Sequence, residues 1–295
     1  NGNVYYIRTF LNNMLTIPTS TKPKKNNMTM AQRADRHELY ELSVQCSEAE
    51  VDFVLDTFNK LRGRKPALVR EDFFGTANVC CEWVRRDKKL EAIGVDLDPE
   101  VLAWGLQNNL AKLRHKQRQR IHLLQEDVLK VKTEAPDIIC AMNFSYWLFK
   151  ERDTLKRYFE SVFEALKADG IFFLDAYGGY DSFRELEEER EVETADGGRV
   201  TYVWEQAEFN PVNHDVTCHI HFLFDDNSRL DRAFSYHWRL WVLPEIQDLL
   251  NEVGFKVTVY WQGWAEDGEP DGDFLPATEG DADAGWICYI VAEKT

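Results

Sequence analysis

Three acidic side chains in the first half of the chain stand where short apolar runs end. They are Glu71, Asp96 and Asp127. Apolar runs of this length are typical of buried strands, so each acid is expected near the end of a strand. A carboxylate in that place can accept hydrogen bonds from ribose hydroxyls or amino groups. An acid about 20 residues after a glycine-bearing turn is typical of nucleotide-binding βαβ units, and the spacing of Glu71 and Asp96 therefore predicts a nucleotide site.

The elements around these acids follow the same pattern. The apolar runs that precede them are Leu68–Val69, Ala92–Val95 and Ile121–Leu124. After Glu71 the chain turns at Gly75-Thr76 and has helical periodicity from Asn78 onward. Asp98 and Pro99 have the residue types of a helix N-cap and of a first helical position. Strand, glycine-bearing turn and helix together predict that backbone N–H groups and a helix N-terminus face a ligand.

The segment from Glu71 to Ala77 resembles the acid-x-Gly-x-Gly-x-Gly loop of class I S-adenosylmethionine (SAM) dependent methyltransferases. It keeps the acid and the middle glycine, Gly75, and has Phe73 and Ala77 in place of the outer two. Four further segments resemble the later motifs of that family in order: Gly94–Asp98, Gln125–Val128, Asp137–Asn143 and Gly170–Asp175. The resemblance implies a Rossmann-like α/β fold, with a mostly parallel sheet that ends in an antiparallel C-terminal hairpin.

The resemblance also implies which residues hold the methionyl and ribose parts of SAM. The backbone at Phe73 and Gly75 approaches the methionyl part, and Glu71 receives its ammonium group. Asp96 accepts the ribose hydroxyls. The residues themselves leave two alternatives open. Asp96 can cap a helix or form a turn, and Glu71 can form an ion pair with Arg70.

The same resemblance assigns the adenine side and the methyl group. Leu97 packs against adenine, Asp127 receives the adenine amino group, and the Val128 backbone completes the edge of the base. Asn143 lies where the fourth strand opens onto the methyl group. Tyr40 matches a tyrosine on a helix that covers the cofactor in many members of the family. Helix capping or turn formation by Asp127 and simple packing by Tyr40 are the alternatives.

The sequence divides into five parts around this core. They are a tail at 1–30, helices that cover the site at 31–66, a SAM-binding core at 67–176, an inserted antiparallel β region at 177–240, and a C-terminal helix with a closing β-hairpin at 241–295. Strict alternation in Val200–Trp204 and Val216–Phe222 predicts the inserted sheet. It follows the fifth strand, next to the carboxyl ends of the parallel strands, and can cover the site and select the substrate. A capping box is expected at Ser47–Glu50 and a solvated acidic loop at 266–283.

Aromatic side chains after the fourth strand are expected to meet the methyl acceptor. Tyr177 and His237 are the candidates for contact with the nucleophile. Five more aromatic residues are candidates for binding the substrate: Tyr146, Trp147, Trp204, Tyr236 and Trp241. Ring faces can hold an amine cation at about 0.5–2 kcal/mol each, although packing of the inserted sheet explains the same residues. Methyl transfer needs alignment more than a base, and the sequence shows no catalytic triad.

Bulk properties restrict the partners. The net charge of −16 disfavours DNA or RNA as a substrate and admits neutral or cationic small molecules. No run is long and apolar enough to span a membrane. The six cysteines do not form two Cys-x-x-Cys pairs, which argues against zinc, and their apolar settings favour a reducing, cytoplasmic environment. His219 and His221 share a strand face but lack a third ligand, so no metal site is expected.

The sequence thus predicts a SAM-dependent methyltransferase for a small molecule, with an amine nitrogen slightly favoured over oxygen as the acceptor. Three alternatives stay open: a SAM-binding protein without catalysis, a protein methyltransferase, and an NAD-dependent oxidoreductase, since an acid after the second strand suits NAD as well. The missing Gly-x-Gly-x-x-Gly weighs against the last. The oligomeric state is left open, with a homodimer as one option.

Overall fold

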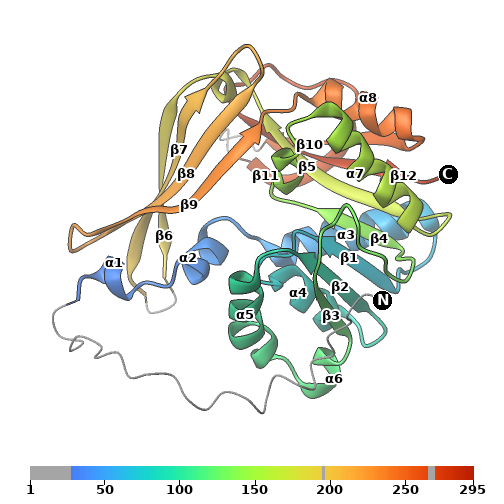
Figure 1. Ribbon diagram of the computed structural model, residues 1–295, viewed down its shortest axis with the longest axis horizontal. Coiled ribbons are helices and arrows are strands. Elements are labelled where there is room, and N and C mark those ends of the chain that lie inside the picture. Colours follow the sequence, from blue (N-terminus) through green and yellow to red (C-terminus); the bar gives the residue numbers. More distant parts are fainter. Residues whose placement is uncertain (1–27, 195–196, 265–269) are drawn as a thin grey trace.

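The computed structural model describes residues 28–194, 197–264 and 270–295. Within them the chain forms an eight-stranded sheet and a four-stranded sheet, on the right and on the left of Figure 1 respectively. Nearly all of the tail predicted at 1–30 lies outside the described residues.

The eight-stranded sheet has the strand order β11-β10-β12-β5-β4-β1-β2-β3. Its strands are β1 (Leu68–Asp72), β2 (Glu91–Asp96), β3 (Ile121–Gln125), β4 (Ile138–Ala141), β5 (Ile171–Gly178), β10 (Lys256–Trp264), β11 (Pro270–Ala277) and β12 (Trp286–Glu293). Strands β1 to β5 are parallel, whereas β12 is antiparallel to β5, β10 to β12, and β11 to β10. The prediction of a mostly parallel sheet that ends in antiparallel C-terminal strands is confirmed.

Strand β11 corrects one expectation. The solvated loop predicted for 266–283 is wrong over Pro270–Ala277, where the chain pairs with β10 through partners such as Pro276 and Tyr260. The segment is acidic, but charged side chains and prolines are tolerated on an edge strand, which has a partner on one side only. The predicted hairpin of β10 and β12 therefore carries a third strand on its outer edge.

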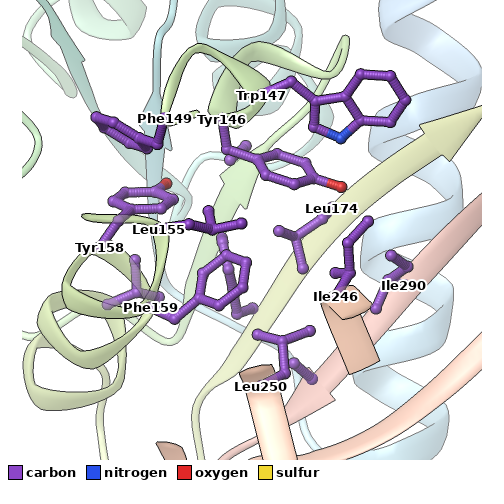
Figure 2. Close-up of a cluster of buried hydrophobic side chains, with 14 of the residues drawn as sticks. Tyr146, Trp147, Phe149, Leu155, Tyr158, Phe159, Leu174, Ile246, Leu250 and Ile290 are labelled. Atoms are coloured by element: carbon purple, nitrogen blue, oxygen red, sulfur yellow. The ribbon is translucent and has the colours of Figure 1, made fainter. Parts of the chain in front are cut away.

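Helices cover both faces of the large sheet. The helices α3 (Ser47–Arg62), α4 (Asn78–Arg86) and α5 (Pro99–Asn108) pack with one buried cluster, and α7 (Arg152–Ala165) and α8 (Leu243–Val253) pack with another. Figure 2 shows the second cluster, where Phe159 of α7 lies near Leu174 of β5 and Leu250 of α8. Three short helices complete the set: α1 (Met30–Arg33), α2 (Arg36–Ser43) and α6 (His115–Arg118). Among the helices of the described ranges, none combines the length and apolar character that a membrane crossing requires.

Helix α3 begins differently from the prediction. Ser47 is already the first helical residue, and Cys46 is the N-cap, with no side-chain hydrogen bond at that cap. The capping box expected from Ser47 and Glu50 is therefore wrong. Glu50 is instead buried, with 8% of its surface exposed. A negative charge in the first turn of a helix is stabilised by the helix dipole. Burial of the Glu50 side chain removes water from its carboxylate, and this loss of hydration destabilises the charged form.

The face of β1 toward α7 carries a buried ion pair. Nε of Arg70 lies 2.8 Å from Oδ1 of Asp72, and the Tyr158 hydroxyl donates to Oδ2 of the same carboxylate at 2.9 Å. Successive side chains on a strand point to opposite faces, so Arg70 and Asp72 share one face while Glu71 points to the other. Arg70 therefore pairs with Asp72, and the ion pair with Glu71 that was open from the sequence does not form.

The four-stranded sheet is antiparallel throughout and follows β5, as predicted. It consists of β6 (Leu186–Glu193), β7 (Arg199–Phe209), β8 (Asp215–Phe224) and β9 (Arg229–Arg239). Strand β6 was not expected, because its glutamates hide the strand pattern at an exposed edge. Leu39 of α2 packs with Val200 and Ile220 of this sheet, and Figure 1 shows α2 between the small sheet and α5.

Gly105 lets α5 approach the turn after β1 closely. A Cβ atom on Gly105 would lie 2.4 Å from the carbonyl oxygen of Thr76. Asn109, one turn later on the chain, donates a hydrogen bond to that same oxygen at 3.0 Å. The helix therefore rests directly on the backbone of the turn that the sequence assigns to ligand binding.

We expect Gly105→Ala to lower the free energy of unfolding by about 1–3 kcal/mol, because the added methyl group must push α5 away from the turn. Urea denaturation measures the change. Gly285→Ala is the control, since a Cβ at Gly285 meets nothing within 4 Å. Equal stability of the two variants would contradict the close approach.

Candidate functional site

The turn after β1 folds back over the end of β2. Phe73, Gly75 and Ala77 all have positive φ, at 60°, 55° and 60°. The N–H of Phe73 donates to the carbonyl of Val95 at 2.8 Å. Phe73 and Ala77 adopt a conformation that costs energy for residues other than glycine, which is typical of functional turns. The turn that lacks two of the expected glycines thus has the left-handed backbone that glycines usually supply.

Asp96 joins this turn to the one that follows β2. Its Oδ2 accepts the N–H of Gly75 at 2.9 Å, and its Oδ1 accepts the N–H of Asp98 at 3.0 Å. Burial raises the pKa of the Asp96 carboxyl group. A carboxylate has about four lone-pair sites, so Asp96 keeps acceptor capacity for further donors. Beside it, Leu97 is 63% exposed and offers an apolar surface.

Helix α2 is attached to the same turn through Glu41. The Glu41 carboxylate accepts hydrogen bonds from the hydroxyl of Thr76 and the side-chain amide of Asn109. The preceding residue, Tyr40, is half-buried, and its ring packs against Phe234 with centroids 4.9 Å apart. Burial raises the pKa of Tyr40, and its hydroxyl interacts with that of Tyr236 on β9. Tyr40 thus lies between the turn and the small sheet, as a covering residue would.

A second strained turn follows β4. Asn143 and Phe144 have φ values of 56° and 55°. Their N–H groups donate to the two carboxylate oxygens of Asp175 at 2.7 and 2.9 Å. Among the described residues, the turns after β1 and β4 contain four of the seven non-glycine residues with positive φ. Such a concentration at neighbouring strand ends is typical of a ligand site.

Four buried or largely buried carboxylates gather at these strand ends. They are Glu50 of α3, Glu71 of β1, Asp96 of β2 and Asp175 of β5, here called the acidic group. Burial raises the pKa of Glu71 to about 8, with further contributions from the charges of Glu50 and Asp96. Burial and the charge of Asp175 raise the pKa of Glu50 to about 7. Burial also raises the pKa of Asp175 to about 7.

The acidic group lacks a basic partner within 28–194, 197–264 and 270–295. None of its four members forms an ion pair there with a lysine, arginine or histidine. Glu71 accepts the backbone N–H of Cys80 at 3.1 Å and also interacts with the thiol of Cys80, and neither partner carries a positive charge. Buried charges are normally paired, so this arrangement is suited to a cationic ligand.

Asp127 and Val128 lie on the turn after β3. The Asp127 carboxylate accepts the N–H of Leu129 at 3.0 Å and lies 2.9 Å from Nζ of Lys130. This is the turn-forming role that the sequence left open for Asp127. Val128 is buried. Glu71 and Asp96 influence each other electrostatically, whereas Asp127 sits on a separate turn, and its role toward adenine stays a prediction.

An aromatic cluster connects the turn after β4 with the inner face of the small sheet. The ring centroids of Phe144 and Tyr177 are 4.8 Å apart, those of Tyr177 and Trp204 are 6.4 Å apart, and those of Trp204 and Tyr236 are 6.3 Å apart. Tyr236 also stacks on Trp238 at 4.3 Å. The structure therefore brings together three predicted residues, Tyr177, Trp204 and Tyr236.

Three residues predicted to bind the substrate belong to the core instead. Tyr146, Trp147 and Trp241 are at most 1% exposed, and Figure 2 shows Tyr146 and Trp147 above Leu174 in the buried cluster. The Tyr146 hydroxyl donates to the carbonyl of Asp175 at 2.8 Å, and the Trp241 indole donates to the carbonyl of Phe149 at 3.1 Å. The polar atoms of Tyr146 and Trp241 are thus satisfied by the backbone, whereas the indole N–H of Trp147 has no hydrogen-bond partner among the described residues. All three rings pack in the interior as large apolar groups.

His237 is also placed away from the site. Side chains alternate along β9, so Tyr236 and Trp238 point to the aromatic cluster and His237 points to the opposite, exposed face. Its Nδ1 lies 3.4 Å from the hydroxyl of Thr217. His237 therefore cannot contact a nucleophile next to Tyr177 in this arrangement.

The two histidines of β8 have side-chain partners of their own. His219 contacts Ser235 at 2.8 Å, and His221 lies between Glu205 and Asp231 at 2.9 and 2.6 Å. In the part of the chain that the structure describes, no group of three or more His, Cys, Asp or Glu residues could hold a metal ion.

Three site residues escaped the sequence analysis. Glu50 was assigned to a cap, and Asp175 was recognised only as the end of a motif. Gln206 of β7 is buried and donates to the carbonyls of Asp181 and Arg184 at 3.0 and 2.9 Å, while its Oε1 lies 3.5 Å from the Tyr177 hydroxyl. A polar residue at an inward position of an alternating strand is the signal that could have identified Gln206.

The sequence matches no protein-family model and no curated protein. Several solved structures share its fold. SAM-bound CalS10, an amino pentose methyltransferase from Micromonospora echinaspora, has a TM-score of 0.63 at 15% identity, covering 88% of this chain and 96% of that one. A SAM-dependent methyltransferase from Clostridium acetobutylicum has a TM-score of 0.61 at 18% identity, covering 87% and 96%. The sugar N-methyltransferase KedS8 from a Streptoalloteichus species has a TM-score of 0.60 at 15% identity, covering 95% and 98%.

We expect Glu71→Gln to stabilise the ligand-free protein relative to the wild type, and more at pH 8 than at pH 5.5. The folded protein holds a proton on Glu71 up to about pH 8, whereas the unfolded chain releases it near pH 4.3. Folded protein thus binds more protons than unfolded protein across this interval, and the contribution of Glu71 to stability falls as the pH rises through it.

Denaturant unfolding at the two pH values measures this difference. Glu91→Gln, at an exposed position at the start of β2, is the control and should show no such trend. A stabilisation by Glu71→Gln that does not depend on pH would contradict the assignment of a raised pKa to Glu71.

Proposed function

We propose that this protein transfers a methyl group from SAM to an amine nitrogen of a small molecule. The observation that carries the proposal is the hydrogen bond from the Gly75 N–H to Asp96, which joins the ligand-facing turns of β1 and β2 beside the acidic group. The shared fold with SAM-dependent methyltransferases supports it. The acidic group and the aromatic cluster, at neighbouring strand ends, supply two distinct surfaces for a cofactor and an acceptor.

The residues at the strand ends fit SAM in chemical type. The spare lone pairs of Asp96 suit two ribose hydroxyls, and the exposed side chain of Leu97 suits an adenine face. Glu71, buried without a basic partner among the described residues, suits the ammonium group of the methionyl part. The proposal also assigns the Phe73 and Gly75 backbone to the methionyl part, Asp127 and Val128 to the edge of adenine, Asn143 to the vicinity of the methyl group, and Tyr40 to the cover.

Bound SAM supplies a methyl group on a positively charged sulfur, which is already a good electrophile. The protein then has to bring a nitrogen lone pair into line with that methyl group and exclude water. Alignment of this kind can account for roughly 7–11 kcal/mol of acceleration. We assign it to Tyr177, Trp204 and Tyr236, whose rings can contact the acceptor, with Tyr177 held by Gln206.

An amine is preferred over a hydroxyl group as the acceptor for two reasons. The acidic group and the aromatic faces both favour a cation. CalS10 and KedS8, which share the fold, are an amino pentose methyltransferase and a sugar N-methyltransferase. A protein acceptor, a SAM-binding role without transfer, and an NAD-dependent oxidoreductase are the alternatives. Incubation with methyl-labelled SAM and a metabolite or protein extract separates the first two from the proposal, because labelled protein or no labelled product at all would contradict it.

The first prediction for this function concerns cofactor binding. Asp96→Asn should weaken binding of S-adenosylhomocysteine at least tenfold, because each charge-assisted hydrogen bond to the ribose is worth about 1.5–3 kcal/mol. Isothermal titration calorimetry measures the affinity. Asp98→Asn makes the same change of charge two residues later and keeps a good N-cap residue for α5, so its affinity should match the wild type. Binding of NADH in place of S-adenosylhomocysteine by the wild type would favour the oxidoreductase.

The second prediction concerns Tyr177. Tyr177→Phe should leave the affinity for S-adenosylhomocysteine unchanged and lower kcat by roughly tenfold, the effect of about one hydrogen bond. Tyr180→Phe is the matched control, since Tyr180 is 64% exposed. Loss of cofactor binding in Tyr177→Phe would place this residue on the cofactor side, and unchanged turnover would remove it from the acceptor site.

A further inference from the structure

Glu50 is buried in a way that its position on α3 does not explain. It lies in the first turn of the helix with 8% of its surface exposed. Its Oε2 atom is buried and has no hydrogen-bond partner among the described residues. Buried carboxylate oxygens are normally satisfied, and an exception calls for an explanation such as a ligand.

The first turns of α3 pack against β12 beside Asp175, because Phe53, one turn after Glu50, stacks on Tyr289 with ring centroids 4.3 Å apart and Tyr289 pairs with Asp175 across β12 and β5. Groups from five other elements lie within electrostatic range of Glu50, including Cys140 of β4. Asp175 of β5 and Glu71 of β1 interact with it as like charges. Tyr289 of β12 and Tyr40 of α2 lie within electrostatic range of both Glu50 and Asp175. No lysine or arginine in the described part of the chain forms an ion pair with Glu50 or with Asp175. Glu50 and Asp175 therefore form a buried pair of carboxyl groups edged by phenol groups, and a bound cation would lower the raised pKa values of both.

This pair lies on the acceptor side of the site. Asp175 holds the backbone of Asn143 and Phe144, and the Phe144 ring begins the aromatic cluster through its contact with Tyr177. Tyr40, which faces the pair, also contacts Tyr236 at the far end of that cluster. A cation between Glu50 and Asp175 would thus be next to the rings that we assign to the acceptor.

We propose that Glu50 and Asp175 bind the ammonium form of the acceptor and that Glu50 removes its proton before methyl transfer. The inference rests on the proposed function and identifies the acceptor as an amine that arrives protonated. Both oxygens of Asp175 already accept backbone N–H groups, so Asp175 is held in place and supplies a second carboxylate beside a bound cation. The free Oε2 of Glu50 is the atom that can take the proton.

The proposed step transfers one proton to Glu50 and one methyl group to nitrogen. One N–H bond of the ammonium group breaks, its proton passes to Oε2 of Glu50, and the electron pair stays on nitrogen. That lone pair forms the new N–C bond to the methyl carbon while the C–S bond breaks and leaves its electrons on sulfur. The product is a methylated ammonium ion with Glu50 protonated, and Glu50 returns its proton to water when the product leaves. A carboxyl group whose pKa is raised to about 7 is closer in pKa to an amine than an ordinary carboxyl group is. Proton transfer from the ammonium group to Glu50 is therefore less unfavourable.

Amine binding tests the inference separately from turnover. The probes are 2-, 3- and 4-amino-deoxyglucose, each compared with glucose, and their affinities are measured by calorimetry in the presence of saturating S-adenosylhomocysteine. The wild type should bind at least one amino sugar at least tenfold more tightly than glucose. Glu50→Gln should lose most of that preference, whereas Glu48→Gln, an exposed change in the same turn, should keep it.

The pH profile gives a readout that a purely structural role would not change. Amine affinity of the wild type should fall on the acidic side near pH 7, where Glu50 and Asp175 become protonated. Glu50→Gln should make this limb shallower and move it to lower pH, because Asp175 then titrates without the like charge of Glu50, whereas Glu48→Gln should leave the limb unchanged. Glu50→Asp, which keeps the carboxylate, should retain part of the preference for amines and confirms that the fold tolerates substitution there.

The outcomes that overturn the inference differ from those that overturn the proposed function. Failure of the wild type to bind S-adenosylhomocysteine contradicts the function itself. Normal cofactor binding with no preference for an amino sugar, or with an unchanged preference in Glu50→Gln, contradicts only the inference. Weaker cofactor binding in Glu50→Gln with intact amine binding would assign Glu50 to the ammonium group of the cofactor and would also overturn it.

Discussion

The burial of several carboxylates at adjacent strand ends is the constraint that the rest of the site depends on. Charged carboxylates away from water are costly, and they usually take up a proton or find a cation. The protein uses both solutions in different places. On the α7 side of β1, Asp72 has Arg70 and Tyr158 as fixed partners. On the opposite side, Glu50, Glu71 and Asp175 have no basic partner among the described residues, and burial raises the pKa of each. One strand thus separates a permanent ion pair from a set of acids that a ligand can satisfy.

The turns that hold these acids are strained, and the strain has identifiable supports. Phe73 and Ala77 keep positive φ because Val95, Asp96 and α5 fix the surrounding backbone. Asn143 and Phe144 keep it because Asp175 accepts both of their N–H groups. Asp175 therefore has two structural consequences at once, since it shapes the turn after β4 and places a negative charge beside it. A site whose charges also hold its backbone needs little rearrangement when a ligand enters.

The parallel core could be predicted from the sequence because each strand there is a short apolar run followed by turn residues, as at Ala92–Val95 before Asp96. The inserted sheet was visible from alternation in β7 and β8, but the glutamates of β6 and the acidic residues of β11 concealed two edge strands. Aromatic residues were the least predictable. Tyr146 and Tyr177 both lie near the carboxyl end of a core strand, yet tertiary packing buries Tyr146 fully and leaves Tyr177 half-buried beside Phe144. The role predicted for His237 does not fit the structure for a simpler reason. Side chains alternate along β9, so His237 lies on the face opposite Tyr236.

The proposed cofactor and acceptor have one property in common, because both carry positive charge that buried carboxylates can balance. SAM carries an ammonium and a sulfonium charge beside one carboxylate, and a protonated amine adds another positive charge. Glu71 and the Glu50–Asp175 pair are placed to oppose such charges from two sides of the turn after β4. A neutral hydroxyl acceptor would leave Glu50 without a cation and would gain nothing from the buried Oε2 atom. The same acids would favour the protonated amine on binding and then, by accepting its proton, free the lone pair that the transfer needs. In the proposed reaction, the cost of burying these acids is thus offset by the positive charge of the amine that the site would select.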